Sequence, residues 1–295
     1  MHTATYYIDL LLSGITVGSL FALIAIGYTM VYGILRLINF AHGDIFMMAG
    51  FFMVYISASM PMAVAIPVVL IMTVALGLLI ERAAYKPLRS APRMSVMISA
   101  IGVSYLLQNL ATYITGGLAR PYPEIPFLKG TFMLGALKIK IITVVTPLLT
   151  ILLVIALVLF INHTKTGMAM RAVSRDFDTA RLMGIKVNNI ISVTFIIGSF
   201  LAGVGSILYF SNYGQVSPTI GAMPGLKAFV AAVFGGIGSI PGAVLGAYII
   251  GICESLIKAN DAIAIFSNAF TFALLILVLL FKPNGMFGEK LAEKV

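Results

Sequence analysis

The sequence predicts an all-α polytopic membrane protein that forms one transmembrane domain over residues 1–295. Of the 295 residues, 60% are hydrophobic and only 10% are charged, and the mean hydropathy is +1.07. Several apolar segments approach the roughly 20 residues that a helix needs to cross a bilayer. The basic residues gather in a few gaps between these segments, as they do in loops that face the cytoplasm.

Charge and cysteine content argue against several other classes. The formal net charge is +9, but the basic residues lie in short gaps between apolar segments, so we expect no nucleic acid partner. The single cysteine, Cys253, excludes an internal disulfide. The sequence contains no His, Cys, Asp or Glu cluster with metal-ligand spacing, and no arrangement of a nucleophile with a base. We therefore expect no catalytic residue, no metal ligand and no enzyme activity.

The positions of the basic residues predict the topology. Four lie in residues 81–93, five in residues 162–189 and three in the tail from Lys282, which together hold twelve of the nineteen. These three gaps are expected in the cytoplasm. The first basic residue is Arg36, so the N-terminus lacks the charged region of a cleavable signal peptide. We expect the N-terminus outside the cytoplasm and the C-terminus inside.

The apolar runs predict about eight membrane-spanning helices and one shorter element. The expected crossings cover residues 10–30, 45–59, 61–80, 95–115, 141–161, 190–210, 238–257 and 262–281. The run over residues 226–234 is too short to span a bilayer and is followed by glycines, which predicts a short broken or re-entrant helix. A tight helical hairpin with its tip at the cytoplasmic face is the alternative.

Four polar residues interrupt the apolar pattern before the second crossing: Arg36, Asn39, His42 and Asp44. Charges at such a junction are costly unless they are paired or hydrated, so they mark a functional or a tightly structural position. We take Asn39, His42 and Asp44 as candidate site residues. In the alternative, His42 and Asp44 only bind the backbone at a helix break.

Residues 116–140 form the longest gap on the outward side. Gly116-Gly117 and three nearby prolines indicate turns. The alternating tract around Leu134-Gly135-Ala136 predicts a small hairpin on the outer surface.

The longest polar break, residues 162–189, carries five basic residues against two acidic ones, Asp176 and Asp178. Its pattern predicts a short amphipathic helix that starts at Thr164 or Thr166 and ends at Gly184 in the left-handed position. Small or apolar contacts are expected from Met168, Ala172, Val173, Ala180 and Met183. A solvated basic loop that obeys the positive-inside rule is the alternative.

A weak internal repeat relates the two ends of the chain. A shift of 196 positions aligns Lys86-Pro87 with Lys282-Pro283 and His42 with Gly238. The glycine-rich stretch around Gly235, Gly238 and Gly242 would then correspond to the polar break after the first crossing. If the halves are related, the two breaks should face each other. The alternative is that both breaks only allow helices to pack closely.

Five motifs carry a family resemblance: NFAHGD, TGMAMRAVSRD, DTARLMGI, GGIGSIPGAVLGA and KPNGMFG. In this order, from about residue 10 to residue 288, they resemble the LivH-type permeases of branched-chain amino acid ABC importers. Residues 178–184 resemble the E-A-A-x-x-x-G loop that forms the coupling helix in such permeases, although Asp178 and Thr179 replace Glu and Ala. The resemblance implies a single permease domain with a cytoplasmic coupling loop over residues 162–189 and a periplasmic loop over residues 116–140.

The resemblance also implies roles and partners. The ATPase-coupling residues would be Arg171, Arg175, Asp178, Ala180 and Gly184. The internal repeat, and not the resemblance, places the translocation pathway near the two breaks, at Asn39, His42, Asp44, Gly235, Gly238 and Gly242. The resemblance implies a subunit of the bacterial inner membrane. Its expected partners are a homologous second permease subunit, two cytoplasmic ATPase subunits, a periplasmic amino acid-binding protein and membrane lipid.

The sequence agrees with the resemblance in one respect, the absence of an ATP-binding motif. The sequence contains no G-x-x-x-x-G-K-[ST], so this chain is not expected to bind ATP as a P-loop ATPase, and no other cofactor is expected on it. Import of leucine, isoleucine or valine, driven by ATP on the partner subunits, is the favoured function. A urea or short-amide ABC permease and an ion-coupled secondary transporter are the alternatives. Scarce intramembrane ionisable residues argue against the ion-coupled one.

Overall fold

The computed structural model describes residues 2–89, 91–134, 137–282 and 285–287. In the first part of the chain, the helices are α1 (His2–Leu35), α2 (His42–Ile56), α3 (Met62–Ile80), the π-helical turn η1 (Glu81–Tyr85) and α4 (Arg93–Thr115). In the second part they are α5 (Ile141–His163), α6 (Lys165–Arg175), α7 (Phe177–Leu182), α8 (Val187–Tyr213), α9 (Ala222–Gly235), α10 (Ile240–Lys258), the 3-10 turn η2 (Ala264–Phe266) and α11 (Ser267–Phe281).

Seven helices in the described part of the chain are long and apolar enough to cross a membrane: α1, α3 with η1, α4, α5, α8, α10 and η2 with α11. Two shorter apolar helices, α2 and α9, complete the set. The prediction of an all-α polytopic membrane protein is confirmed. A short helix followed by a break and a second helix was expected from residue 226 onward, and α9 and α10 have this form.

Residues 45–59 were predicted to cross the membrane, but the helix that the structure has there is shorter than a crossing. Helix α2 has 15 residues, which makes it about 22 Å long, too short for the roughly 30 Å hydrocarbon core. Residues on every side of α2 are buried, from His42 through Phe51. A short helix that is enclosed by protein is apolar on all sides, as a membrane crossing is. Composition alone therefore does not distinguish the two.

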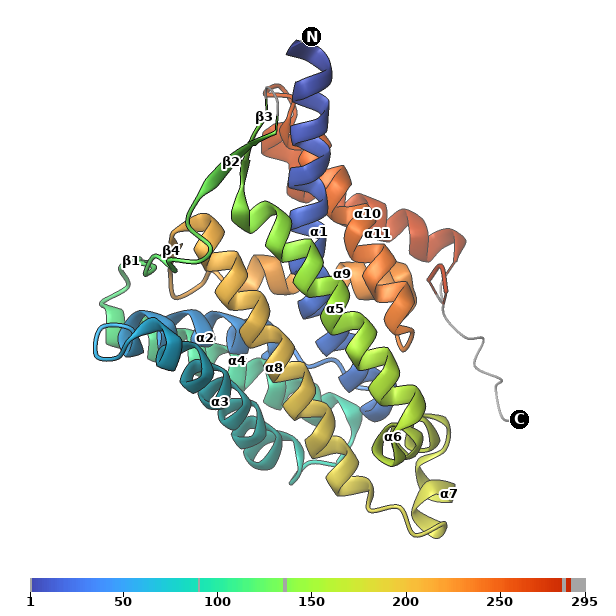
Figure 1. Ribbon diagram of the computed structural model, residues 1–295. Coiled ribbons are helices and arrows are strands. Elements are labelled where there is room, and N and C mark those ends of the chain that lie inside the picture. Colours follow the sequence, from blue (N-terminus) through green and yellow to red (C-terminus); the bar gives the residue numbers. More distant parts are fainter. Residues whose placement is uncertain (1, 90, 135–136, 283–284, 288–295) are drawn as a thin grey trace.

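Helix α1 lies at the centre of the bundle, between α8, α9 and α10 (Figure 1). In an apolar 18-residue window of α1 and of α8, 67% and 72% of the residues are buried, against 11% in the window that contains α11. Close packing of α1 on α10 depends on glycines. A Cβ added at Gly18 would lie 2.8 Å from the Tyr248 Cα, and one at Gly251 would lie 2.3 Å from the Gly18 nitrogen. Small residues therefore let these two backbones approach each other.

The polar segments lie at opposite ends of the molecule. Strands β2 (Thr131–Leu134) and β3 (Leu137–Lys140) form an antiparallel hairpin near the N-terminal end of α1, and α6 and α7 lie at the other end (Figure 1). The hairpin was predicted, although its turn residues 135–136 lie outside the described residues. A second antiparallel pair joins β1 (Arg120–Pro121) to β4 (Gln215–Val216) and ties the loop over residues 116–140 to the end of α8.

Candidate functional site

The polar break over residues 162–189 folds into two helices, so the prediction of one helix was wrong. Thr164 caps the first of them, α6, because its hydroxyl oxygen accepts from the Gly167 nitrogen at 3.0 Å. Asp176 then takes extended backbone angles and caps α7, its Oδ1 accepting from the nitrogens of Asp178 and Thr179 at 3.1 and 3.0 Å. An aspartate that satisfies free N–H groups in this way starts a new helix and ends the previous one. We call residues 162–189 the coupling segment.

The predicted helix end at Gly184 is confirmed. Gly184 has a φ of +82°. Its nitrogen donates to the Arg181 oxygen and the Ile185 nitrogen donates to the Ala180 oxygen, both at 3.1 Å. This pair of hydrogen bonds is the Schellman motif, in which glycine is favoured because the backbone is left-handed. A Cβ at Gly184 would meet no atom within 4 Å, so a substitution there acts through backbone strain rather than through a clash.

The apolar side chains of the coupling segment are divided between its interior and its surface. Met170, Val173 and Ala180 are buried, but Met168 and Met183 are 61% and 78% exposed. Met168 and Met183 therefore leave their apolar side chains open for contacts outside this chain. With Phe177 and Leu182 they are the large exposed apolar residues of α6, α7 and the turn that follows, and we call these four the exposed apolar face.

The other predicted coupling residues lie on or under this surface. Arg171 donates to the Asn162 side-chain oxygen at 2.8 Å, which fastens α6 to the end of α5. Arg175 and Asp178 are exposed at the junction of α6 and α7, and Ala180 lies beneath them. A monomer gains little from exposing several large apolar side chains among charges, so this face has the composition of a protein-binding surface.

The first helix break begins at Arg36. This residue has a φ of +55° and is the one non-glycine residue with a positive φ among those described. Its guanidinium Nη2 donates to the Ser174 carbonyl oxygen at 2.9 Å. The break after α1 is therefore bonded directly to the coupling segment.

The predicted site residues of this first break are buried but do not come together. Asn39, His42 and Asp44 are each at most 2% exposed. The Asn39 Oδ1 accepts from the Tyr85 hydroxyl at 2.7 Å, and the Asp44 Oδ1 accepts from the Gln108 amide at 3.0 Å. These three side chains are held by different elements and form no common binding site.

His42 packs into the gap that two glycines leave in α1 and α8. A Cβ added at Gly27 would lie 2.1 Å from the His42 Nε2, and one at Gly198 would lie 3.6 Å from its Cε1. The ring of Tyr28 lies edge-on, with the ring centroids 4.9 Å apart. The His42 Nε2 is buried and has no hydrogen-bond partner among the described residues.

The second break, between α9 and α10, is held mainly by the backbone. A Cβ at Gly235 would lie 1.9 Å from the Gly242 carbonyl oxygen, and one at Gly242 would lie 2.4 Å from the Gly235 oxygen. Gly238 has a φ of +100° and open space around its Cβ position. Ser239 caps α10, its hydroxyl accepting from the Gly242 nitrogen at 3.2 Å. The contact between Gly235 and Gly242 thus matches the packing alternative for these two residues, while Gly238 faces open space.

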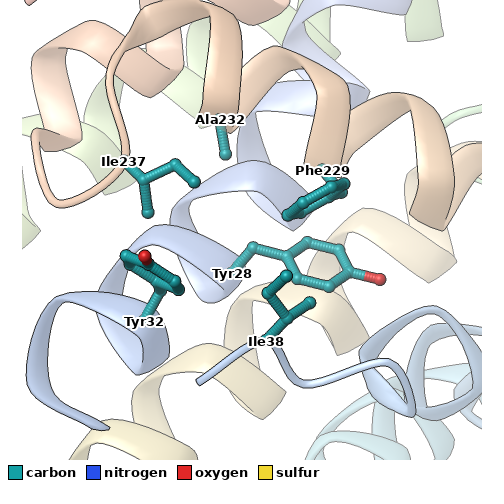
Figure 2. Close-up of a pocket in the computed structure, with 6 residues that line it drawn as sticks. All are labelled: Tyr28, Tyr32, Ile38, Phe229, Ala232 and Ile237. Carbon is teal, nitrogen blue, oxygen red and sulfur yellow. The ribbon is translucent and has the colours of Figure 1, made fainter. Parts of the chain in front are cut away.

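The two breaks lie side by side, as the internal repeat predicted. A Cβ added at Gly33 would lie 3.6 Å from the Gly238 Cα. A narrow pocket between α1, the first break, α9 and the second break is lined by Tyr28, Tyr32, Ile38, Phe229, Ala232 and Ile237 (Figure 2). Ile38 and Ile237 point into it from the two breaks. Of the predicted residues, Asn39 and Gly238 each follow a lining residue in the chain, and none of the residues that line the pocket was predicted. The spacing of Tyr28 and Tyr32, one turn apart on α1, was the available signal.

A buried ion pair was also missed. The Lys227 Nζ lies 2.6 Å from the Glu254 Oε1, and Lys258 reaches the same oxygen at 2.5 Å. Lys227 and Glu254 are 6% and 3% exposed. Both lie within apolar segments, where a lone charge is a functional candidate by default. The pair joins α9 to α10 on the side away from the second break.

Comparison with known proteins gives one family. Residues 10–279 match the model of the branched-chain amino acid transport system / permease component. The chain is 42% identical over 306 residues to the high-affinity branched-chain amino acid transport system permease protein BraD of Pseudomonas aeruginosa, with 98% of each chain covered. It is 40% identical over 305 residues to the LivH protein of Escherichia coli K12, again with 98% of each covered. A probable LivH protein of Methanocaldococcus jannaschii is 29% identical, with 92% of this chain and 89% of that one covered. No solved structure matches at a significant level.

Proposed function

The chain belongs to the family of permease components of branched-chain amino acid transport systems, and from this premise we propose that it moves leucine, isoleucine and valine across the bacterial inner membrane. It is a multi-pass permease subunit of an ABC importer. The observation that carries the proposed substrate is the end-to-end similarity to permeases of this specificity, at 40–42% identity over 98% of the chain.

Energy comes from two cytoplasmic ATPase subunits that dock on the coupling segment. The exposed apolar face formed by Met168, Phe177, Leu182 and Met183 supports this role. Arg171, Arg175 and Asp178 surround it with charges that orient a partner. Ala180 and Gly184 fix the shape of α7 and its end. This chain binds no cofactor of its own and ATP stays on the partner subunits, in keeping with the lack of a P-loop motif.

The opposite end of the molecule faces the periplasm. The loop over residues 116–140, with its β2–β3 hairpin, contacts the periplasmic amino acid-binding protein, and the N-terminus lies on the same side. The C-terminus lies in the cytoplasm. Support for this orientation is the collection of basic residues at the end that holds α6 and α7. A second, homologous permease subunit completes the membrane part of the importer.

The substrate passes between the two helix breaks on its way across the membrane. The pocket there has no room for a water molecule in this structure, and its aromatic and aliphatic lining would suit a branched aliphatic side chain once the two breaks separate. Gly238 borders it, with Asn39, His42 and Asp44 behind the first break and Gly235 and Gly242 closing the second. The buried charges of Lys227 and Glu254 neutralise each other.

Reconstitution in proteoliposomes tests the proposal. The purified permease with its second permease subunit, ATPase subunits and binding protein should accumulate radiolabelled leucine only with ATP on the cytoplasmic side. Unlabelled isoleucine and valine should compete, and urea should not. Leucine uptake that follows an ion gradient without ATP would contradict the proposal in favour of a secondary transporter, and competition by urea or acetamide would favour an amide permease.

A further inference from the structure

We propose that the π-helical turn η1 transmits movement of the coupling segment to the first helix break and so to the pocket. The inference rests on the proposed function, because an ATPase partner has to move the coupling segment. It assigns Glu81 and Tyr85 as positioning residues, which act through the backbone they hold and not by contact with the substrate.

The turn itself is an unusual local structure. The Lys86 nitrogen donates to the Glu81 oxygen at 2.8 Å, an i to i+5 bond that widens the end of α3 by one residue. Such turns are rare and are found mostly at functional sites. The Ser99 hydroxyl on α4 donates to the Ala84 carbonyl oxygen at 3.2 Å, so a neighbouring helix holds one of the carbonyls of the turn.

On its cytoplasmic side, η1 is fastened to the start of α8. Glu81 is 1% exposed. Its carboxylate accepts from the Arg89 guanidinium and, at 3.1 Å, from the Ser192 hydroxyl. Arg89 also donates to the Asn188 side-chain oxygen. Asn188 and Ser192 lie in the first two turns of α8, whose first three residues are also the last three of the coupling segment. A shift of the coupling segment therefore displaces the partners of Glu81.

On its inner side, η1 holds the first break. The Tyr85 hydroxyl donates to the Asn39 Oδ1 at 2.7 Å, and both residues are 1% exposed. The Tyr85 ring also packs on Phe195 of α8, with the centroids 5.2 Å apart. The residue before Asn39 is Ile38, which lines the pocket (Figure 2). Movement of the turn therefore reaches a pocket wall through one hydrogen bond.

A second connection runs in parallel. Arg36, three residues before Asn39, donates to the Ser174 oxygen of α6 at 2.9 Å. The two connections reach the same short break from two parts of the cytoplasmic end, α6 and the start of α8. Buried hydrogen bonds have discrete geometries, so a pair of them can hold the break in one of two positions.

Cysteine labelling at the pocket wall tests the turn. The variant Ile38→Cys is made in a Cys253→Ala background and assembled with the ATPase subunits, and its maleimide labelling rate is measured with and without ATP. The rate should differ between the two states. Tyr85→Phe should reduce this ATP-dependent difference by about 3- to 10-fold, the size of effect seen when one element of a coupling route is removed. The matched control is Tyr209→Phe, since the Tyr209 ring packs against aromatic residues and its hydroxyl makes no hydrogen bond with another described residue.

Yield of the assembled complex is measured for each variant, so that misfolding is recognised. If Tyr85→Phe lowers the yield, Glu81→Gln serves as the second variant, and it should reduce the same difference. An unchanged ATP-dependent difference in both variants would overturn the inference. It would also be overturned if the labelling rate of Ile38→Cys, with Glu81 and Tyr85 both present, were the same with and without ATP. Leucine uptake is measured on the same complexes. Labelling that responds to ATP without leucine uptake would contradict the proposed substrate and leave the inference standing.

Discussion

The two helix breaks lie side by side but are built in different ways. The first break is held by side-chain hydrogen bonds, one from Arg36 to the Ser174 carbonyl oxygen and one from Tyr85 to the Asn39 side chain. The second is held by the direct contact of Gly235 with Gly242, and by the tail, whose residues 286 and 287 donate to the last carbonyls of α9 at 2.9 Å. The first is connected to the coupling segment, whereas the second forms a compact hairpin with its neighbouring helices.

This difference indicates a division of labour. Hydrogen-bonded side chains can exchange partners, so the first break suits a part that moves with the ATPase cycle. Glycine backbones in van der Waals contact leave no room to rearrange, so the second break suits a fixed wall against which the first one moves. Substitutions at the contact of Gly235 with Gly242 in the second break should therefore act on assembly, and those at the first break should act on coupling.

The largest expected effect is at the backbone contact of the second break. In Gly235→Val, the new Cβ would lie 1.9 Å from the Gly242 oxygen. Overpacking against a backbone atom should destabilise the protein by about 3 kcal/mol or more and remove most of the assembled complex. Size-exclusion chromatography of the solubilised complex measures this loss. Gly102→Val is the control, because a Cβ at Gly102 meets no atom within 4 Å. Normal assembly of Gly235→Val would refute the fixed-wall description.

The next effect tests the buried ion pair that joins α9 to α10 on the side away from the second break. Lys227→Met removes one partner of the buried Glu254 carboxylate and leaves only Lys258. Breaking a buried ion pair costs about 3–5 kcal/mol, and the remaining lysine should reduce this to about 2–3 kcal/mol. Thermal unfolding of the purified complex measures it. Adding Glu254→Gln should recover part of the loss, because the unpaired charge is then gone. No recovery in the double variant would show that the loss comes from packing.

A smaller effect is expected at the first break. Asn39→Ala leaves the Tyr85 hydroxyl without its acceptor in a buried site, which should cost about 1–3 kcal/mol. Adding Tyr85→Phe should restore part of this stability, because both partners are then removed. In the same melting assay, additive losses from the two substitutions would count against a direct bond between the side chains.

The smallest stability effect, and a selective effect on transport, is expected at Gly238. Gly238 and Gly214 have φ values of +100° and +75°, and a Cβ at either position meets no atom within 4 Å. Leucine at each position should therefore strain the backbone by similar amounts, about 1–2 kcal/mol. Only Gly238 borders the pocket. Gly238→Leu should reduce leucine uptake at least fivefold relative to Gly214→Leu at equal complex yield. Equal uptake in the two variants would remove Gly238 from the pathway.

Local signals in the sequence predicted the parts that depend on neighbouring residues. The cap at Thr164, the left-handed end at Gly184 and the hairpin around Leu134 follow from turn and capping chemistry. The apolar runs predicted the long helices, and the polar and glycine-rich stretches predicted both breaks. Each of these features is determined within about ten residues.

Features that depend on distant partners were not predictable in this way. The bond from Tyr85 to Asn39 spans 46 positions, and Lys227 to Glu254 spans 27. The enclosure of α2 depends on which helices surround it, and an apolar run does not report that. Asp176 divided the coupling segment because its side chain capped α7, a role that an interior aspartate in an amphipathic pattern does not reveal. Polar residues in the breaks were located correctly, but the pocket between the breaks is lined by their apolar neighbours.

Cross-linking the second break to α1, three residues before the first break begins, tests most directly whether the two breaks separate during transport. Gly33 and Gly238 lie close enough for a disulfide, since a Cβ at Gly33 would be 3.6 Å from the Gly238 Cα. The double variant Gly33→Cys/Gly238→Cys is made in a Cys253→Ala background, and each single variant reports the effect of the substitution alone. Oxidation of the double variant should abolish ATP-driven leucine uptake in proteoliposomes, and reduction should restore it to the level of the weaker single variant. Full uptake with the disulfide formed would contradict the account, because the substrate would then not pass between the breaks.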